Sequence, residues 1–89
     1  MLYLRINYIA NRYNCQEVYK KMQIFQERLL EQRKLYKMTQ QQVAEYLHIT
    51  QPSYIRYENG SAEPCLENLV KLADLFDVST DFLLGRTQY

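Results

Sequence analysis

The chain has 89 residues, of which 47% are hydrophobic, so it can bury the core of one small domain and no more. Its formal net charge of +1 neither favours nor excludes a nucleic-acid partner, so the distribution of charge decides more than the sum. The sequence has no run of about 18 apolar residues and no apolar-centred secretion signal, which excludes a membrane helix. We therefore expect a cytoplasmic protein.

Metal and catalytic chemistry find little support. Cys15 and Cys65 stand far apart, His48 is the single histidine, and there is no Cys-x-x-Cys pair, which predicts free thiols and no metal site. The chain has only two glycines, hence no glycine-rich phosphate loop, and no nucleophile lies at a recognisable spacing from His48. We expect no enzyme, no catalytic residue, no cofactor and no small-molecule ligand.

Residues 1–21 give weak structural signals. YLRINYI alternates like a strand, whereas NRYNCQEVYKK has the composition of a frayed helix. Gln16-Glu17-Val18 can be encoded by CAGGAGGTN, which contains a bacterial ribosome-binding sequence a short way before the codon for Met22. We therefore treat residues 1–21 as an N-terminal extension, hypothesise that Met22 is the natural start, and assign residues 22–89 to the domain.

Five helices, and no strand, are predicted between residues 24 and 85. The first spans residues 24–37, with a partial apolar stripe at Phe25, Leu29 and Tyr36. The second begins at Thr39, whose hydroxyl can accept from the Gln42 backbone while the Gln42 side chain reaches back, as in a capping box. Its buried side is predicted to consist of Val43, Ala44 and Leu47.

A tight turn, His48-Ile49-Thr50, separates the second helix from the third, residues 50–58. His48 is predicted to have a positive φ. Thr50 caps the third helix, and Pro52 fits its first turn because no intrahelical partner exists there for a backbone N–H. Asn59-Gly60 ends the helix with residues that accept left-handed geometry.

The remaining two helices close the core. The fourth runs from Leu66 to Phe76, and the fifth is capped by Ser79 and ended by Gly85. The apolar positions that we expect to be buried are Leu66, Leu69, Val70, Ala73 and Phe76 in the fourth helix and Phe82, Leu83 and Leu84 in the fifth.

Thr39 to Gly60 thus reads as two short helices joined by a tight turn, which fits the major groove of DNA if the second helix presents polar side chains outward. A helical wheel places Tyr54 and Tyr57 toward the core and a mixed set on the opposite face: Gln51, Pro52, Ile55, Arg56 and Asn59. Gln51 can bond adenine bidentately and Arg56 guanine. Ile55 either contacts a thymine methyl group or packs against a neighbouring helix.

RLLEQRKLYKMTQQQVAEYLHITQPSYIRYENG followed by EPCLENLVKLADLFDVSTDFLLGRT resembles the Cro/cI-type (XRE-like) phage-repressor family of helix-turn-helix proteins. The resemblance covers about residues 24–87. It implies an all-α, compact five-helix, lambda-repressor-like domain that binds double-stranded operator DNA as a homodimer on a pseudo-palindrome. It also implies that Arg33 and Glu58 pair across the first and third helices and hold the recognition helix in place.

Phosphate contacts are expected around the hairpin. Gln40 resembles the family glutamine that reaches a DNA phosphate near an oriented helix N-terminus; its alternative is a solvated side chain. The further candidates are Thr39, Ser53, Asn59 and Lys37. Asn59 also terminates its helix, and Lys37 is equally well read as a solvated lysine.

Three departures from the family pattern predict few phosphate contacts and a shallow salt dependence. Gln32 replaces a leucine, the loop Ser61-Ala62-Glu63 lacks a basic residue, and Cys65 replaces a capping serine. Residues 22–89 hold seven basic and nine acidic side chains, a net charge of −2.

The sequence therefore predicts a transcriptional regulator, a repressor, that inserts helix 50–58 into the major groove. We expect dimer contacts from the end of the domain that carries Leu83, Leu84 and the tail 86–89. The alternative is a protein-interaction module on the same fold with weak DNA affinity, as in an antitoxin or a polymerase-binding protein, which the negative charge of residues 22–89 favours.

Overall fold

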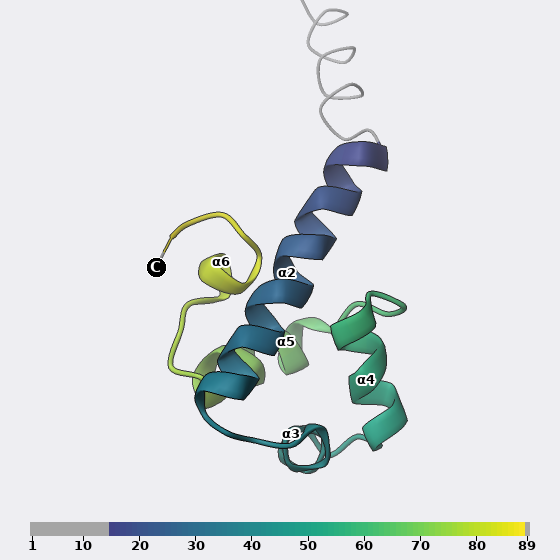
Figure 1. Cartoon of the computed structure of the whole chain (residues 1–89), viewed down its shortest axis with the longest axis vertical. Coiled ribbons are helices and arrows are strands. Elements are labelled where there is room, and N and C mark those ends of the chain that lie inside the picture. The colour runs from purple at the N-terminus through teal and green to yellow at the C-terminus, as the bar shows by residue number, and fades with distance from the viewer. Residues whose placement is uncertain (1–14, 89) are drawn as a thin grey trace, which may run out of the picture.

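A computed structural model describes residues 15–88, with side chains from Gln23 onward. This part of the chain contains five helices and no strand: α2 (Cys15–Leu35), α3 (Gln40–Leu47), α4 (Gln51–Asn59), α5 (Leu66–Leu75) and α6 (Thr80–Leu83). Helix α2 crosses the fold diagonally and packs against α4 on one side and α6 on the other (Figure 1). Helix α3 contacts both α4 and α5. The predicted all-α, five-helix, lambda-repressor-like fold is confirmed.

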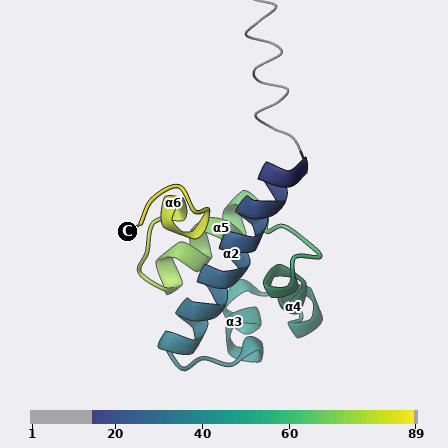
Figure 2. The same cartoon turned by 45° about the horizontal axis from the view of Figure 1, so that its top comes forward.

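Helix α2 is longer than predicted, because it begins at Cys15 and not at Ile24. Its first turns project beyond the other helices in both views (Figures 1 and 2). The composition of NRYNCQEVYKK indicated only a frayed helix, because the stretch lacks a clear cap and a complete apolar stripe. The expectations for residues 1–14 lie outside the described residues.

The hairpin caps have the predicted geometry. Thr39 Oγ1 accepts from Gln42 N at 3.1 Å, and Gln42 Oε1 accepts from Thr39 N at 2.8 Å, which completes the capping box. His48 ends α3 with a φ of 58°, and Gly60 ends α4 with a φ of 83°. Thr50 caps α4, and Pro52 lies in its first turn. The caps at the ends of these two helices are therefore those that the local sequence predicts.

Of the five positions predicted to be buried in the region of α5, three are buried, namely Leu69, Ala73 and Phe76, and two are exposed. Leu72 is fully buried, whereas Leu66 and Val70 are 80% and 50% exposed. Leu69, Leu72, Ala73 and Phe76 satisfy helical spacing as well as the predicted set does, so periodicity alone could not choose between the two stripes. Leu83 in α6 is buried as expected, whereas Phe82 is half-buried and Leu84, directly after α6, is exposed.

The core lies between α2 and the four shorter helices. Its largest fully buried side chains are Leu29, Val43, Tyr54, Leu72, Phe76 and Leu83. Tyr36 follows α2, which ends at Leu35 and not at Lys37 as predicted; it is half-exposed, and its ring contacts that of Phe76 at 5.7 Å between centroids. Arg28 fastens the C-terminal segment to α2, because its Nη1 donates to the carbonyl oxygens of Phe82 and Thr87.

Candidate nucleic-acid interface

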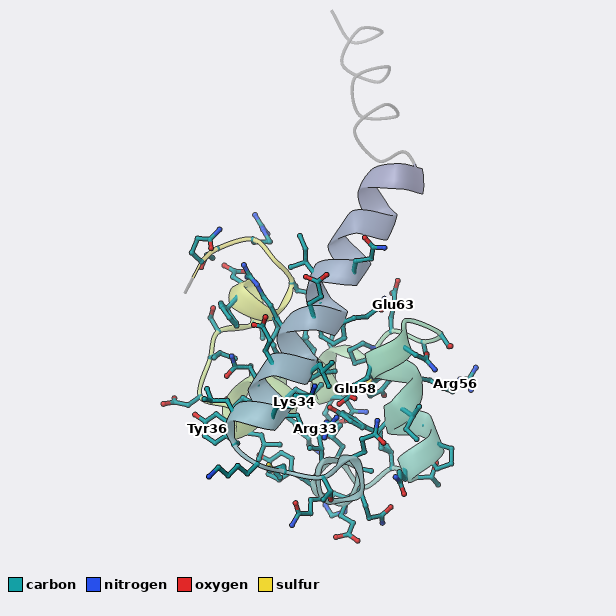
Figure 3. The ribbon with its side chains drawn as sticks, viewed as in Figure 1. Arg33, Lys34, Tyr36, Arg56, Glu58 and Glu63 are labelled. Atoms are coloured by element: carbon teal, nitrogen blue, oxygen red, sulfur yellow. The ribbon has the colours of Figure 1, made fainter. Side chains whose placement is uncertain are left out.

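Helix α4 turns one face to the core and the other to solvent. Tyr54 and Tyr57 are buried, as predicted, and Arg56 extends away from the body of the protein (Figure 3). In the predicted outward set, two side chains are half-buried, Gln51 and Ile55. Three are exposed, namely Pro52, Arg56 and Asn59. Polar donors and an arginine at this spacing match what a helix needs to read base edges.

The N-terminal end of α4 carries a linked pair of hydroxyl groups. Thr50 Oγ1 accepts from Ser53 N at 3.3 Å and donates to Ser53 Oγ at 2.9 Å. Because Ser53 Oγ accepts here, its own hydroxyl hydrogen is left to donate to a further acceptor. The half-buried Ser53 is thus prepared to act as a donor beside a helix N-terminus, where anions bind favourably.

The opposite end of α4 also leaves donors facing outward. Asn59 Oδ1 accepts from Ser61 N at 2.9 Å and from Ser61 Oγ at 2.6 Å. These bonds occupy the amide oxygen, so Asn59 presents its Nδ2 hydrogens to solvent. Next to this end, Glu63 lies in the loop that follows α4, where an acidic side chain disfavours phosphate (Figure 3).

The side chain that joins the hairpin to the rest of the fold is Glu58. Its carboxylate forms a bidentate ion pair with Arg33, in which Arg33 Nε lies 2.6 Å from Glu58 Oε2 and Arg33 Nη2 lies 3.2 Å from Glu58 Oε1. The two side chains are 15% and 8% exposed. Arg33 Nη1 also donates to the carbonyl oxygen of Met38 at 3.1 Å, which ties α2 to the segment before α3. The predicted Arg33–Glu58 pair is confirmed, and Figure 3 shows the two side chains between α2 and α4.

Two further donors reach the same carboxylate, and the sequence analysis did not anticipate either. Gln40 Nε2 donates to Glu58 Oε1 at 3.1 Å, and Tyr54 OH donates to Glu58 Oε2 at 2.5 Å. Tyr54 precedes Glu58 by one helical turn, so the spacing of the two residues carried a signal for this contact. Gln40 is half-buried rather than solvated, and its predicted phosphate contact remains a prediction.

These contacts set the protonation states of the network. Burial alone would raise the pKa of the Glu58 carboxyl, but the hydrogen bonds from Arg33, Tyr54 and Gln40 together hold this pKa below its ordinary value. Burial and the bond to Glu58 raise the pKa of the Tyr54 hydroxyl far above its ordinary value. Glu58 is therefore an anion and Tyr54 a neutral donor at neutral pH.

The remaining predicted residues are less constrained. Lys37 is exposed in the turn between α2 and α3, with a φ of 56°. Cys65 precedes α5 as a free, exposed cysteine and makes no side-chain cap bond, as its replacement of serine predicted. No group of histidine, cysteine and acidic side chains in the described part of the chain could hold a metal ion. Within the same residues, no helix is long and apolar enough to cross a membrane.

A capped helix-turn-helix whose second helix shows polar side chains to solvent, and is braced from behind, defines a DNA-binding domain. Residues 29–83 match the helix-turn-helix family. The chain belongs to this family, of the Cro/cI-type (XRE-like) kind, as the sequence analysis predicted.

Similar curated proteins are named as regulators of transcription. The transcriptional repressor RstR of the cryptic phage CTXphi, from Vibrio cholerae, is 48% identical over 60 residues, which cover 67% of this chain and 54% of RstR. The regulator AnsR of Bacillus subtilis is 47% identical over 60 residues, which cover 67% and 52% of the two chains. The match thus spans about half the length of these relatives. No solved structure matches the chain significantly.

Proposed function

We propose that this protein is a sequence-specific DNA-binding transcriptional regulator, a repressor, that acts in the cytoplasm by inserting α4 into the major groove of an operator. The observation that carries the proposal is the exposed Arg56 on a helix that Arg33 and Glu58 brace from behind. A long, unpaired cation on an exposed, rigidly held helix face suits guanine, whose O6 and N7 accept from one guanidinium.

The neighbouring side chains complete the proposed base-reading surface. Gln51, in the first turn of α4, can bond N6 and N7 of adenine with its carboxamide. Ile55 offers an apolar group to a thymine methyl, and Pro52 contributes shape without a backbone donor. Each good bidentate contact discriminates against the wrong base by about 1–3 kcal/mol.

Donors at the ends of α3 and α4 would fix the register on the duplex. Ser53 and Asn59 have their acceptor oxygens engaged within the protein, which leaves their hydrogens for phosphate oxygens. Thr39 and Gln40 lie at the start of α3, where the helix dipole favours an anion. Lys37 adds a charge from the turn before α3.

A homodimer would place two copies of α4 in successive major grooves about 34 Å apart on a pseudo-palindromic site. The expectation that Leu83 supplies dimer contacts is wrong, because this side chain is fully buried in the core. Leu84, exposed at the end of α6, remains available for such a contact.

Selection from a pool of random-sequence duplexes tests the proposal with the full chain. We expect enrichment of a sequence with two related half-sites, and we expect Arg56→Ala to relax the preference at one G·C pair per half-site. Lys71→Ala, at a half-buried position of α5 outside α3 and α4, serves as the matched loss of charge and should select the wild-type sequence. Absence of any enriched sequence would favour the alternative, a protein-interaction module, and a pull-down would then identify its partner.

A further inference from the structure

Tyr54 is a buried tyrosine whose hydroxyl group donates a hydrogen bond within the Glu58 network. The residue is 0% exposed, and its hydroxyl donates to Glu58 Oε2 at 2.5 Å. Both residues belong to α4 and lie one turn apart. The other donors to the same carboxylate come from other helices, Arg33 from α2 and Gln40 from α3. Tyr54 is therefore the donor that ties the Glu58 carboxylate to its own helix.

The helix from which each donor comes is important because the terminal torsion of a glutamate side chain is soft, so the carboxylate takes the orientation that its donors impose. Arg33 holds the carboxylate relative to α2, and it shares its guanidinium with the Met38 carbonyl in the segment before α3. The ring of Tyr54 is locked in the core, so its hydroxyl is a fixed point on α4. With Oε2 held there, Oε1 accepts from both Gln40 Nε2 and Arg33 Nη2.

The carboxylate in turn dictates how Gln40 is oriented. A carboxylate only accepts hydrogen bonds, so Gln40 must present its amide nitrogen, as the 3.1 Å contact from Nε2 to Oε1 records. One of the two amide hydrogens is used in this contact. The second hydrogen takes no part in this contact and is left to donate at the N-terminal end of α3.

We propose that Tyr54 is a positioning residue for DNA binding: through Glu58 it holds the Gln40 carboxamide in the orientation that donates to a phosphate. The inference rests on the proposed function, since the Gln40–phosphate contact belongs to it. It makes the phosphate-contacting end of α3 and the base-reading face of α4 a single rigid unit.

Tyr57 offers a matched control on the same helix. It is a buried tyrosine whose hydroxyl accepts from Asn68 Nδ2 at 3.1 Å, on α5, and this bond lies outside the Glu58 network. Tyr54→Phe and Tyr57→Phe each remove one hydroxyl and keep the ring, so the core of each variant remains filled.

The test is a double-mutant cycle with Gln40→Ala, measured by fluorescence anisotropy on the duplex selected by the wild-type chain. Gln40→Ala should weaken binding about fivefold in the wild type, in line with the loss of one ordinary hydrogen bond. In the Tyr54→Phe background it should weaken binding less than about twofold, since the carboxamide is already misoriented. In the Tyr57→Phe background the fivefold loss should return, whatever that variant does to stability.

The outcomes separate this inference from the proposed function. If Gln40→Ala costs the same in all three backgrounds while the wild type still prefers its selected duplex, Tyr54 is not a positioning residue and the proposed function stands. If the wild type does not distinguish the selected duplex from a scrambled one, the proposed function fails and the inference fails with it.

A second measurement needs no DNA. In the free wild-type chain, the NMR shifts of the two Gln40 side-chain amide protons should be separated by more than those of a solvated glutamine, because one of them is bonded to Glu58. Tyr54→Phe should reduce this separation toward that of a solvated glutamine, and Tyr57→Phe should leave it unchanged. A separation that stays at the wild-type value in Tyr54→Phe would overturn the inference without reference to binding.

Discussion

Replacing Arg33 with alanine removes both bonds to Glu58 and the bond to the Met38 carbonyl. The Glu58 side chain is only 8% exposed, so its carboxylate is left poorly solvated. Breaking a buried ion pair from one side costs about 3–5 kcal/mol. Tyr54 and Gln40 still donate to the carboxylate, so we expect a loss of about 2–3 kcal/mol in the free energy of unfolding.

Thermal and urea unfolding of the full chain measure this loss. In a domain of this size the melting temperature falls by about 4–8 °C per kcal/mol, so Arg33→Ala should melt about 10–20 °C below the wild type. DNA affinity should fall as well, because α4 loses its brace. Glu58→Gln in the Arg33→Ala background should recover part of the stability, since a neutral amide is cheaper to bury than an unpaired charge.

Lys71→Ala is the control for this prediction. It breaks the Glu67–Lys71 pair on α5, which is 3.3 Å long and joins side chains that are 75% and 34% exposed. An exposed pair of this kind contributes less than about 0.5 kcal/mol. If Arg33→Ala destabilises the protein no more than Lys71→Ala does, the reasoning about the buried brace is refuted.

Three further predictions concern stability. In urea unfolding, Leu72→Ala should lower the free energy of unfolding by about 2–5 kcal/mol because Leu72 is buried, and Leu66→Ala, at an exposed position, should lower it by less than about 0.5 kcal/mol. Equal losses would mean that α5 buries the stripe that contains Leu66. Cys65→Ser should raise the free energy of unfolding in urea by about 0.5–1 kcal/mol, because α5 lacks a side-chain cap. An unchanged free energy of unfolding would show that the cap position cannot use a hydroxyl. Because the pKa of Glu58 is lowered in the folded protein, its charged form stabilises the fold fully above the unfolded pKa of about 4.3, and this stabilisation is lost as the pH falls through the native pKa. Between neutral pH and pH 3, the free energy of unfolding should therefore fall less in Glu58→Gln than in the wild type. Equal losses of unfolding free energy in the two proteins would count against the network.

The sequence predicted those features that depend on local chemistry. The capping box of Thr39 and Gln42, the left-handed His48 and the position of Pro52 depend on neighbours within a few residues, and all three are confirmed. The Arg33–Glu58 pair was predictable only through the family resemblance, because 25 positions separate the two residues.

Features that depend on how helices meet in space were not predictable in the same way. Two stripes of α5 had the same helical spacing, and only the packing of α5 against α3 and α6 decided that Leu72 is buried and Val70 exposed. Gln40 reaches Glu58 because α3 and α4 lie side by side, a contact that no pattern within α3 encodes. The base and phosphate contacts themselves remain predictions, since they require the duplex.

Binding of the full chain to the duplex enriched by selection tests the central claim most directly. Fluorescence anisotropy at two salt concentrations, with a scrambled duplex of equal composition as reference, separates sequence preference from charge attraction. The proposed function predicts tighter binding to the selected duplex and an affinity that falls with salt, with a slope corresponding to few phosphate contacts for each subunit. Equally weak binding to both duplexes would contradict the claim that this protein reads an operator.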